Sequence, residues 1–553
     1  MIQKCLYCLI LVQFIFSEVT RLPETIIPVK YSLKLTVYLD GYINLPTDKN
    51  QTFEGVVEID LNIKENVLQI TFNSFELTFE KEDCELFDDS GRIDISDLKK
   101  TQELSTIYFN GTISGDAIIK IKYTGNFSKV PFGLYRDRVV YSKPTLISQS
   151  FPLTHMIVPC FNEPWMKAVW EVEITHPVGS VALSNTPEKQ IVYSSLENFK
   201  TTQFYATPIM SPYQLAIIIS DYKYTSGYSD SGTLVRVFAP LNKLNKTNHA
   251  LQVAINSLNK FEITFDINYP LSKLDLFPVK TFPASAMENW GLVIFQESSL
   301  IGYDLKSMEE VVIHVVAHQW FGNLVTMAWY NDYWLNEAFA TIYETDSENK
   351  QLYDYYESYS SDAVDSPLRY LNTNNMWIQF TQPNDQTVYV KGSLVLNMLK
   401  KVIGTWRFRK GIRRYLKENS YKSVNTQILK SYFADSMPEN SPNIDDFLDP
   451  WVEQVGHPLI IVKHFNKTHD ILSQQRFDNN QLDVYDQKFA TPKWNYTWYI
   501  PLWYKNDVGD KERLIWLKPG ELKLIEVNQT TTITNPLCRF NVTGSNIESL
   551  VIN

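Results

Sequence analysis

Two histidines and one glutamate are spaced as the ligands of a single metal ion. His314 and His318 stand four residues apart in the stretch HVVAHQWFGN, so a helix of about 3.6 residues per turn places both on one face. Glu337 follows in WLNEAFA, which we expect to form the next helix. Two imidazoles and a carboxylate are a three-ligand zinc set that leaves a fourth position for water or a substrate carbonyl. The histidine pair alone is more often part of a core, but with the glutamate it predicts a zinc site of the catalytic kind.

The elements that must position these residues lie in the middle of the chain. SMEEVVIHVVAHQWFGNLV is apolar on nearly every side, which is typical of a helix buried inside a domain. Apolar residues at three- and four-residue spacing predict helices from about residue 246 to 456. Strands are predicted on both sides of this region, because apolar and polar residues alternate there, as at Val57, Ile59, Leu61 and Ile63. We therefore expect three domains, at 18–238, 239–456 and 457–553.

Length and composition indicate a globular protein with several cores. A chain of 553 residues is too long for one ordinary core, and 44% of its residues are hydrophobic. The net charge of −11 argues against nucleic acid as the main partner, because a polyanion is repelled by a negative surface.

Residues 1–17 are predicted to be a signal peptide. The apolar run from Cys5 to Phe16 is about twelve residues, shorter than the roughly 20 that span a bilayer. No later stretch reaches that length, so we expect a secreted or extracellular protein without a stable membrane span. An uncleaved signal is the alternative and would make the protein membrane-associated. Export fits the Asn-x-Ser/Thr sequons of a glycoprotein, at Asn50, Asn110, Asn126, Asn245, Asn466, Asn495, Asn528 and Asn541.

Four motifs resemble the aminopeptidase N family of zinc metallopeptidases, the gluzincins. They are SAMENWG at 285–291, HVVAHQWFGN at 314–323, WLNEAFA at 334–340 and VYVKGS at 388–393, in the order and spacing of that family. RLPETIIPVKYSLKL and VPCFNEPWMKAVW are also similar to its first domain. The resemblance implies a multidomain α+β fold, with an N-terminal β-saddle domain, a thermolysin-like and mostly helical catalytic domain, and a small β-sandwich.

The resemblance also implies a role for each motif. His314, His318 and Glu337 would be the zinc ligands. Glu288 would hold the free α-amine of a peptide, since a carboxylate binds an ammonium strongly in a water-poor pocket. Tyr389 would donate to the oxyanion that forms on the substrate carbonyl. The substrate-binding segment would also include Ser285, Ala286, Met287 and Asn289.

Several positions depart from the family pattern. The residue after the first histidine is glutamate in the family and acts as general base, but here it is Val315, which has no proton to accept or give. Losing a general base costs about 10²- to 10⁴-fold in rate, or about 3 to 5.5 kcal/mol of barrier. Ser285 replaces a glycine. The family's amine-binding glutamine aligns with Ser148, with Gln149 next to it, so that contact stays open.

The chain also ends where the β-sandwich ends. We expect either a short form that lacks the family's C-terminal helical domain, or an incomplete sequence.

Three functions are compatible with this pattern, and whether the chain is an enzyme stays open at this point. We favour a zinc-binding homologue that holds peptide N-termini and has lost hydrolysis or retains little of it. The second is a working aminopeptidase in which another group, such as Glu310 one turn before His314, replaces the base. The third is a non-enzymatic extracellular binding module with a vestigial cleft.

Overall fold

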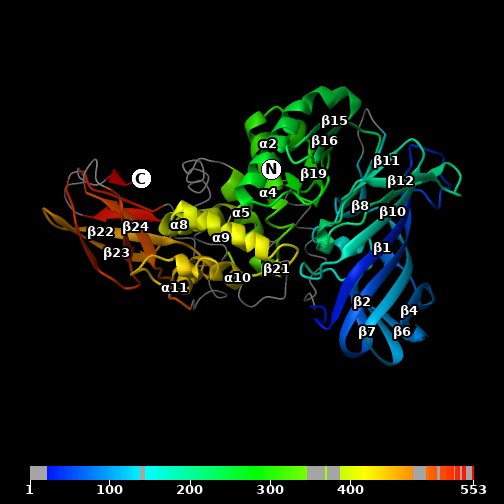
Figure 1. Cartoon of the computed structure of the whole chain (residues 1–553), viewed down its shortest axis with the longest axis horizontal. Helices are drawn as coiled ribbons and strands as arrows, with labels where there is room; N and C mark the ends of the chain where they lie inside the picture. Colours follow the sequence, from blue (N-terminus) through cyan, green and yellow to red (C-terminus); the bar gives the residue numbers. More distant parts are fainter. Residues whose placement is uncertain are drawn as a thin grey trace. The chain divides into compact units, whose positions relative to one another are not determined.

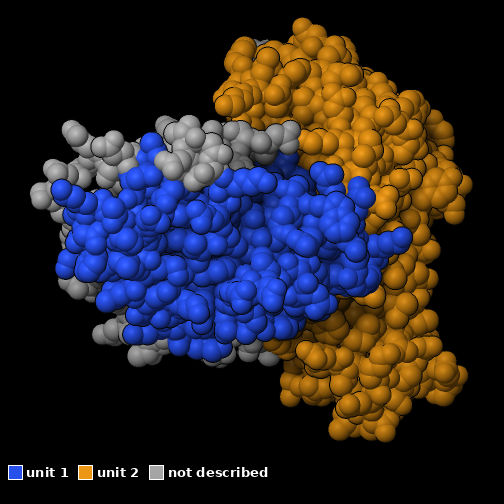
Figure 2. Space-filling view, turned by 60° about the vertical axis from the view of Figure 1, so that its left-hand side comes forward, with its two compact units in different colours: residues 1–20, 329–418, 424–553 blue, residues 21–328, 419–423 orange. Residues whose placement is uncertain are grey.

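The computed structural model describes residues 21–137, 143–344, 368–369, 387–477, 493–506, 511–528, 530–535, 538–543 and 551–552 (Figure 1). The predicted signal peptide at 1–17 lies outside these residues. The chain divides into two compact units, coloured in Figure 2: unit 2 holds residues 21–328 and 419–423, and unit 1 holds the remainder. Within the described residues, no helix is both long enough and apolar enough to cross a membrane.

A ten-stranded sheet begins unit 2 and confirms the strands expected from the alternating sequence. Its order is β12-β13-β10-β1-β2-β7-β4-β5, with β3 and β6 also pairing with β7. In β2, Val57 and Ile59 are fully buried while their neighbours Glu58 and Asp60 are partly exposed, as one wet face requires. The bounds are β1 (Ile26–Tyr38), β2 (Thr52–Asn73), β3 (Leu77–Thr78), β4 (Cys84–Asp88), β5 (Gly91–Ile93), β6 (Ile95–Lys100), β7 (Leu104–Asn126), β10 (Val169–Pro177), β12 (Glu188–Tyr193) and β13 (Phe199–Phe204).

A second sheet of unit 2 has four strands in the order β11-β14-β9-β8. It is buried almost throughout: all described residues of β9 and β14 are buried. Its strands are β8 (Gly133–Asp137), β9 (Thr145–Gln149), β11 (Val181–Ser184) and β14 (Ile217–Ser220).

A third sheet of unit 2 supports the helices around the histidine pair. Its order is β15-β16-β17-β19-β18, and α2 contacts β15, β16 and α4 (Figure 1). The bounds are β15 (Lys223–Tyr228), β16 (Leu234–Ala239), β17 (Lys273–Val279), β18 (Ala286–Met287), β19 (Leu292–Gln296), α2 (Asn248–Phe265), α3 (Glu297–Ile301) and α4 (Leu305–His318). A separate two-stranded sheet pairs β20 (Thr326–Met327) with β21 (Ser423–Val424).

The predicted domain boundary at 238/239 falls inside strand β16. The β15–β16 hairpin pairs with β17 and not with the ten-stranded sheet, so it belongs with the sheet that follows it. Periodicity could not reveal this, because a hairpin shows the same alternation whichever sheet it joins. The division into domains is otherwise untested and stays a prediction.

Unit 1 contains helices followed by two four-stranded sheets, β26-β23-β22-β28 and β25-β24-β27-β29. The helices are α5 (Trp334–Glu344), the π-helical turn η6 (Thr387–Lys391), α8 (Gly392–Ile403), α9 (Thr405–Glu418), α10 (Thr426–Ser431) and α11 (Ile444–Glu453). The strands are β22 (Pro458–Asn466), β23 (His469–Arg476), β24 (Ile500–Lys505), β25 (Arg513–Leu517), β26 (Lys523–Glu526), β27 (Thr532–Thr534), β28 (Arg539–Thr543) and β29 (Val551–Ile552).

The described cysteines form no disulfide. Cys84, Cys160 and Cys538 are buried free thiols, and burial raises the pKa of each above its usual value. The described parts of the fold therefore rest on packing and hydrogen bonds.

Candidate metal centre

Helix α4 presents the two histidines. It begins after Asp304, whose side chain caps the helix by accepting a hydrogen bond from the Ser307 amide at 3.1 Å. Its buried side is apolar and fixes the rotation of the helix, through Met308, Val312, Val316 and Ala317.

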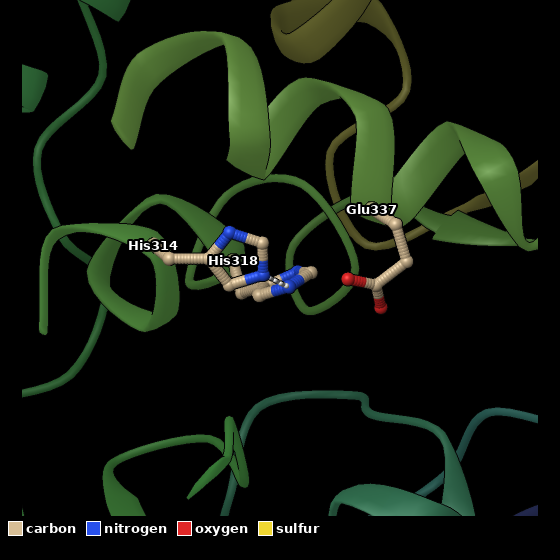
Figure 3. Close-up of side chains that lie close together, drawn as sticks. All are labelled: His314, His318 and Glu337. Carbon is tan, nitrogen blue, oxygen red and sulfur yellow. Dashed lines mark hydrogen bonds between the residues drawn. The ribbon is translucent and has the colours of Figure 1, made fainter. Parts of the chain in front are cut away.

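The two imidazole rings turn the same nitrogen toward one another. His314 Nε2 and His318 Nε2 are 2.9 Å apart, and the rings meet nearly edge to face (Figure 3). His318 Nδ1 lies 2.9 Å from the Phe321 carbonyl oxygen, which can only accept, so Nδ1 carries the proton. The lone pair of His318 is therefore on Nε2, the nitrogen that faces His314. Such a backbone partner commonly fixes the tautomer of a metal-binding histidine.

Glu337 completes the predicted ligand set. It lies in the first turn of α5 and is buried, with 2% of its surface exposed. One ligand atom from each of His314, His318 and Glu337 lies within 4.8 Å of the others, and in Figure 3 the carboxylate points toward the rings. Two nitrogens held about 2.0–2.1 Å from one tetrahedral zinc would stand roughly 3.3 Å apart, close to the separation seen here. The donor types of all three residues and the separation of the two histidine nitrogens thus fit zinc.

Val315 directly follows His314 on α4, in the position where the family resemblance predicts a general base. Its side chain is buried, with 3% of its surface exposed, and its backbone carbonyl accepts a hydrogen bond from Gln319 Nε2 at 3.1 Å. An isopropyl group can neither accept nor donate a proton. Glu310, the suggested substitute, is partly buried on the same helix, one turn before His314.

The segment with Glu288 is attached to the end of α4. Glu288 has 7% of its surface exposed, and its carbonyl accepts from Gln319 Nε2 at 3.2 Å and Asn323 Nδ2 at 2.8 Å. Before it, Ala286 and Met287 pair with β19, and the Ser285 carbonyl accepts from the Gln296 amide at 2.9 Å. The backbone of Glu288, whose carboxylate was predicted to bind an amine, is therefore attached to the end of the helix that carries the histidines.

Asn289 and Gly291 fix the end of this segment against neighbouring backbone. Asn289 Nδ2 donates to the carbonyls of Tyr213 and Leu215, both at 3.3 Å. Gly291 has φ +79°, and a Cβ at this residue would lie 2.2 Å from the Asn185 carbonyl oxygen. Only glycine fits this close approach.

Ser148 and Gln149, between which the amine-binding position was left open, have different surroundings. Ser148 Oγ accepts a hydrogen bond from the Ile217 amide at 2.7 Å and is fully buried, so it serves the fold. Gln149 is 4% exposed, and its Oε1 has no hydrogen-bond partner among the described residues. A buried, unused acceptor on Gln149 is the kind of group that an ammonium ion could engage.

Tyr389 lies in η6, at the start of α8. Its hydroxyl is 3.4 Å from that of Tyr333, and the side chain is half-buried. The turn is anchored by Lys391, whose Nζ donates to the Gly456 carbonyl at 2.9 Å. Gly392 allows α8 to approach α5, because a Cβ there would lie 2.7 Å from the Ala338 Cβ. The glycine after the lysine in VYVKGS is thus explained by helix packing.

The sequence reasoning assigned no role to Gln319, Asn323 or Lys167. Lys167 is buried, and its Nζ lies near the carbonyls of Asn323 and Leu324, at 3.4 and 3.5 Å; burial lowers its pKa to about 7. For Gln319 and Asn323, the signal in the sequence was that two polar side-chain amides follow an otherwise apolar helix in HVVAHQWFGN.

Two protein-family models match the chain. The Peptidase M1 N-terminal domain matches residues 27–214 and the Peptidase family M1 domain matches residues 249–451. Aminopeptidase N of Haemonchus contortus is 32% identical over 92% of this chain and 56% of the relative, and that of Canis lupus familiaris is 30% identical over 95% and 57%. Endoplasmic reticulum aminopeptidase 2 of Homo sapiens is 34% identical over 63% of this chain and 40% of the relative. The chain spans a little over half the length of the two aminopeptidases N that it matches. Together with the grouped histidines and glutamate, these matches lead to one conclusion: the chain belongs to peptidase family M1, the zinc-dependent gluzincin aminopeptidases.

Proposed function

We propose that this chain is an aminopeptidase N-like zinc protein that holds the N-terminus of a peptide and has lost hydrolysis or retains little of it. The observation that carries the proposal is the grouping of His314, His318 and Glu337 within 4.8 Å beside Val315, a residue without a proton to exchange. A metal-binding set is retained while the base expected next to it is missing.

The metal would be held by the three grouped side chains. The tautomer of His318, fixed by the Phe321 carbonyl, supports this assignment. Zinc bound there would supply a Lewis acid and lower the pKa of a bound water to about 7. The protein would contribute the three side chains that hold the metal ion close together.

Recognition of a peptide would rest on groups that match an α-ammonium. The carboxylate of Glu288 would accept its charge-assisted hydrogen bonds, and Gln149 Oε1 is a second acceptor that supports such a role. Tyr389 would donate to a carbonyl oxygen of the ligand. Ser285, Ala286, Met287 and Asn289 would shape the segment that carries Glu288.

The missing base limits turnover. A general base takes the proton of the attacking water and returns it to the leaving amine, so its loss affects two transfers. At about 10²- to 10⁴-fold for such a group, the barrier rises by about 3 to 5.5 kcal/mol. A working enzyme that uses Glu310 is the second candidate, supported only by the place of that carboxylate one turn before His314.

The remaining expectations follow from family membership and the sequence. We infer a β-saddle domain, a thermolysin-like domain and a β-sandwich for the three regions. We also infer secretion through the signal at 1–17, with glycosylation at the sequons. Peptides are the expected ligands, and nucleic acid is not.

The test uses the purified full chain. Expected results are about one zinc per chain, arylamidase activity close to background, and tighter binding of a peptide with a free N-terminus than of its N-acetylated form. Glu288→Gln should remove that preference and leave the zinc content unchanged. Chelator-sensitive turnover at the level of an active aminopeptidase would contradict the proposed loss, and a zinc-free chain would contradict the metal site.

A further inference from the structure

The four residues Glu288–Gly291 have every backbone carbonyl engaged. The Glu288 carbonyl accepts from two side-chain amides, as described above, and the Asn289 carbonyl accepts from the Leu292 amide at 3.1 Å. The Trp290 carbonyl accepts from Asn185 Nδ2 at 2.8 Å. A segment held at each carbonyl cannot shift without leaving buried acceptors unpaired.

Gln319 holds both ends of this segment. Its Nε2 donates to the Glu288 carbonyl at 3.2 Å and to the Val315 carbonyl at 3.1 Å. Its Oε1 accepts from the Gly291 amide at 3.3 Å and from the Tyr269 hydroxyl at 3.2 Å. Both donors and both lone pairs of the side-chain amide are therefore in use, on a fully buried residue.

A buried charge cluster fixes the far end. Lys273 Nζ donates to the Gly291 carbonyl at 2.8 Å and to the Ser184 carbonyl at 2.6 Å, and pairs with Asp275 at 2.7 Å. Arg236 binds the same carboxylate with two nitrogens, at 2.6 and 2.7 Å. Because each buried charge has partners, the cluster is a rigid support from β16 and β17.

Gln319 also connects this segment to the metal helix. It directly follows His318, and its bond to the Val315 carbonyl ties its side chain to the last turn of α4. We propose that Gln319 is a positioning residue that holds the Glu288 carboxylate in register with His314 and His318, so that a bound peptide presents its first carbonyl beside the ligand set while its amine meets Glu288. This inference rests on the proposed function and deepens it, because it names what sets the distance between amine and metal.

The experiment compares two glutamine-to-methionine variants of the full chain. Gln319→Met removes the amide at similar volume. Gln454→Met is the matched control in unit 1: Gln454 is 2% exposed, donates to the Pro450 and Thr497 carbonyls, both at 3.2 Å, and accepts from the Tyr496 amide at 2.9 Å. Both variants lose a buried, fully used amide, so both should lower the melting temperature.

The readouts are zinc content and the ratio of dissociation constants for N-acetylated and free peptides, measured by fluorescence anisotropy with the dye at the C-terminus. Gln319→Met should keep its zinc and lower this ratio by about tenfold, since a small misplacement of a charged partner weakens binding strongly. Gln454→Met should leave the ratio as in the natural chain. An unchanged ratio in Gln319→Met, or an equal fall in both variants, would overturn the inference.

A second readout keeps this result distinct from a failure of the proposed function. If the natural chain does not distinguish free from acetylated peptides, the proposed function fails. Hydrogen exchange of the backbone amides at 286–292 then tests whether Gln319 holds this segment. Faster exchange there in Gln319→Met than in Gln454→Met supports Gln319 as the residue that holds the segment. Equal exchange in the two variants refutes it.

Discussion

Restoring the base should restore chemistry if the site is otherwise assembled. In Val315→Glu, the new carboxylate would stand on α4 directly after His314, where the family has its glutamate. The expected gain in kcat is about 10²- to 10⁴-fold, which equals about 3 to 5.5 kcal/mol of barrier at 1.36 kcal/mol per decade.

The same substitution should cost stability, and the cost can be separated from the gain. Val315 has 3% of its surface exposed, so the variant loses the burial of an aliphatic side chain, about 1.5–3 kcal/mol, and buries a carboxylate as well. Zinc held by the three proposed ligands would bind only the folded chain. At a free zinc concentration about 100 times the dissociation constant, it would raise the free energy of unfolding by roughly 2.7 kcal/mol. The variant should therefore be less stable than the natural chain without zinc and regain stability when zinc is added.

The assay measures kcat and KM on aminoacyl arylamides with zinc in excess, together with melting temperatures with and without zinc. A matched Val315→Gln variant controls for the polar substitution, because glutamine cannot act as the base at neutral pH. If Val315→Glu is folded and loaded with zinc but no faster than Val315→Gln, the reasoning that only the base is missing is refuted.

Three further predictions follow from the described residues. Gly392→Val should lower the free energy of unfolding by about 1–3 kcal/mol through its collision with Ala338, and adding Ala338→Gly should return part of that loss; no coupling in urea melts would contradict the close packing of α8 on α5. Glu337→Gln should weaken zinc binding and the zinc-induced rise in melting temperature, which calorimetry with and without chelator would detect; an unchanged rise would remove Glu337 from the ligand set. Burial lowers the pKa of His155 to about 3, so the unfolded chain binds a proton that the folded chain does not; stability should fall as the pH drops below about 6.5, by about 2 kcal/mol at pH 5, and His155→Gln should reduce that slope in urea melts.

The parts of the structure that the sequence could predict are those governed by short periods. The histidine pair depends on a helix repeat, and the strands near Val57 depend on a repeat of two, so both follow from local pattern. Gln319 depends on contacts with Glu288 and Gly291, about thirty residues away in sequence, and no spacing rule reaches that far. The choice between Ser148 and Gln149 likewise depends on which side chain meets the Ile217 amide.

On the proposed function, the contacts around residue 315 would let the site lose its base and keep its shape. Gln319 Nε2 donates to the backbone carbonyls of Glu288 and Val315, so neither hydrogen bond uses the side chain of residue 315. His318 likewise has its tautomer fixed by the Phe321 carbonyl. A change of side chain at position 315 would therefore leave these hydrogen bonds of Gln319 and His318 in place. On the proposed function, a change at 315 should therefore alter hydrolysis and spare metal binding and peptide recognition, which should respond to substitutions at 337 and 288.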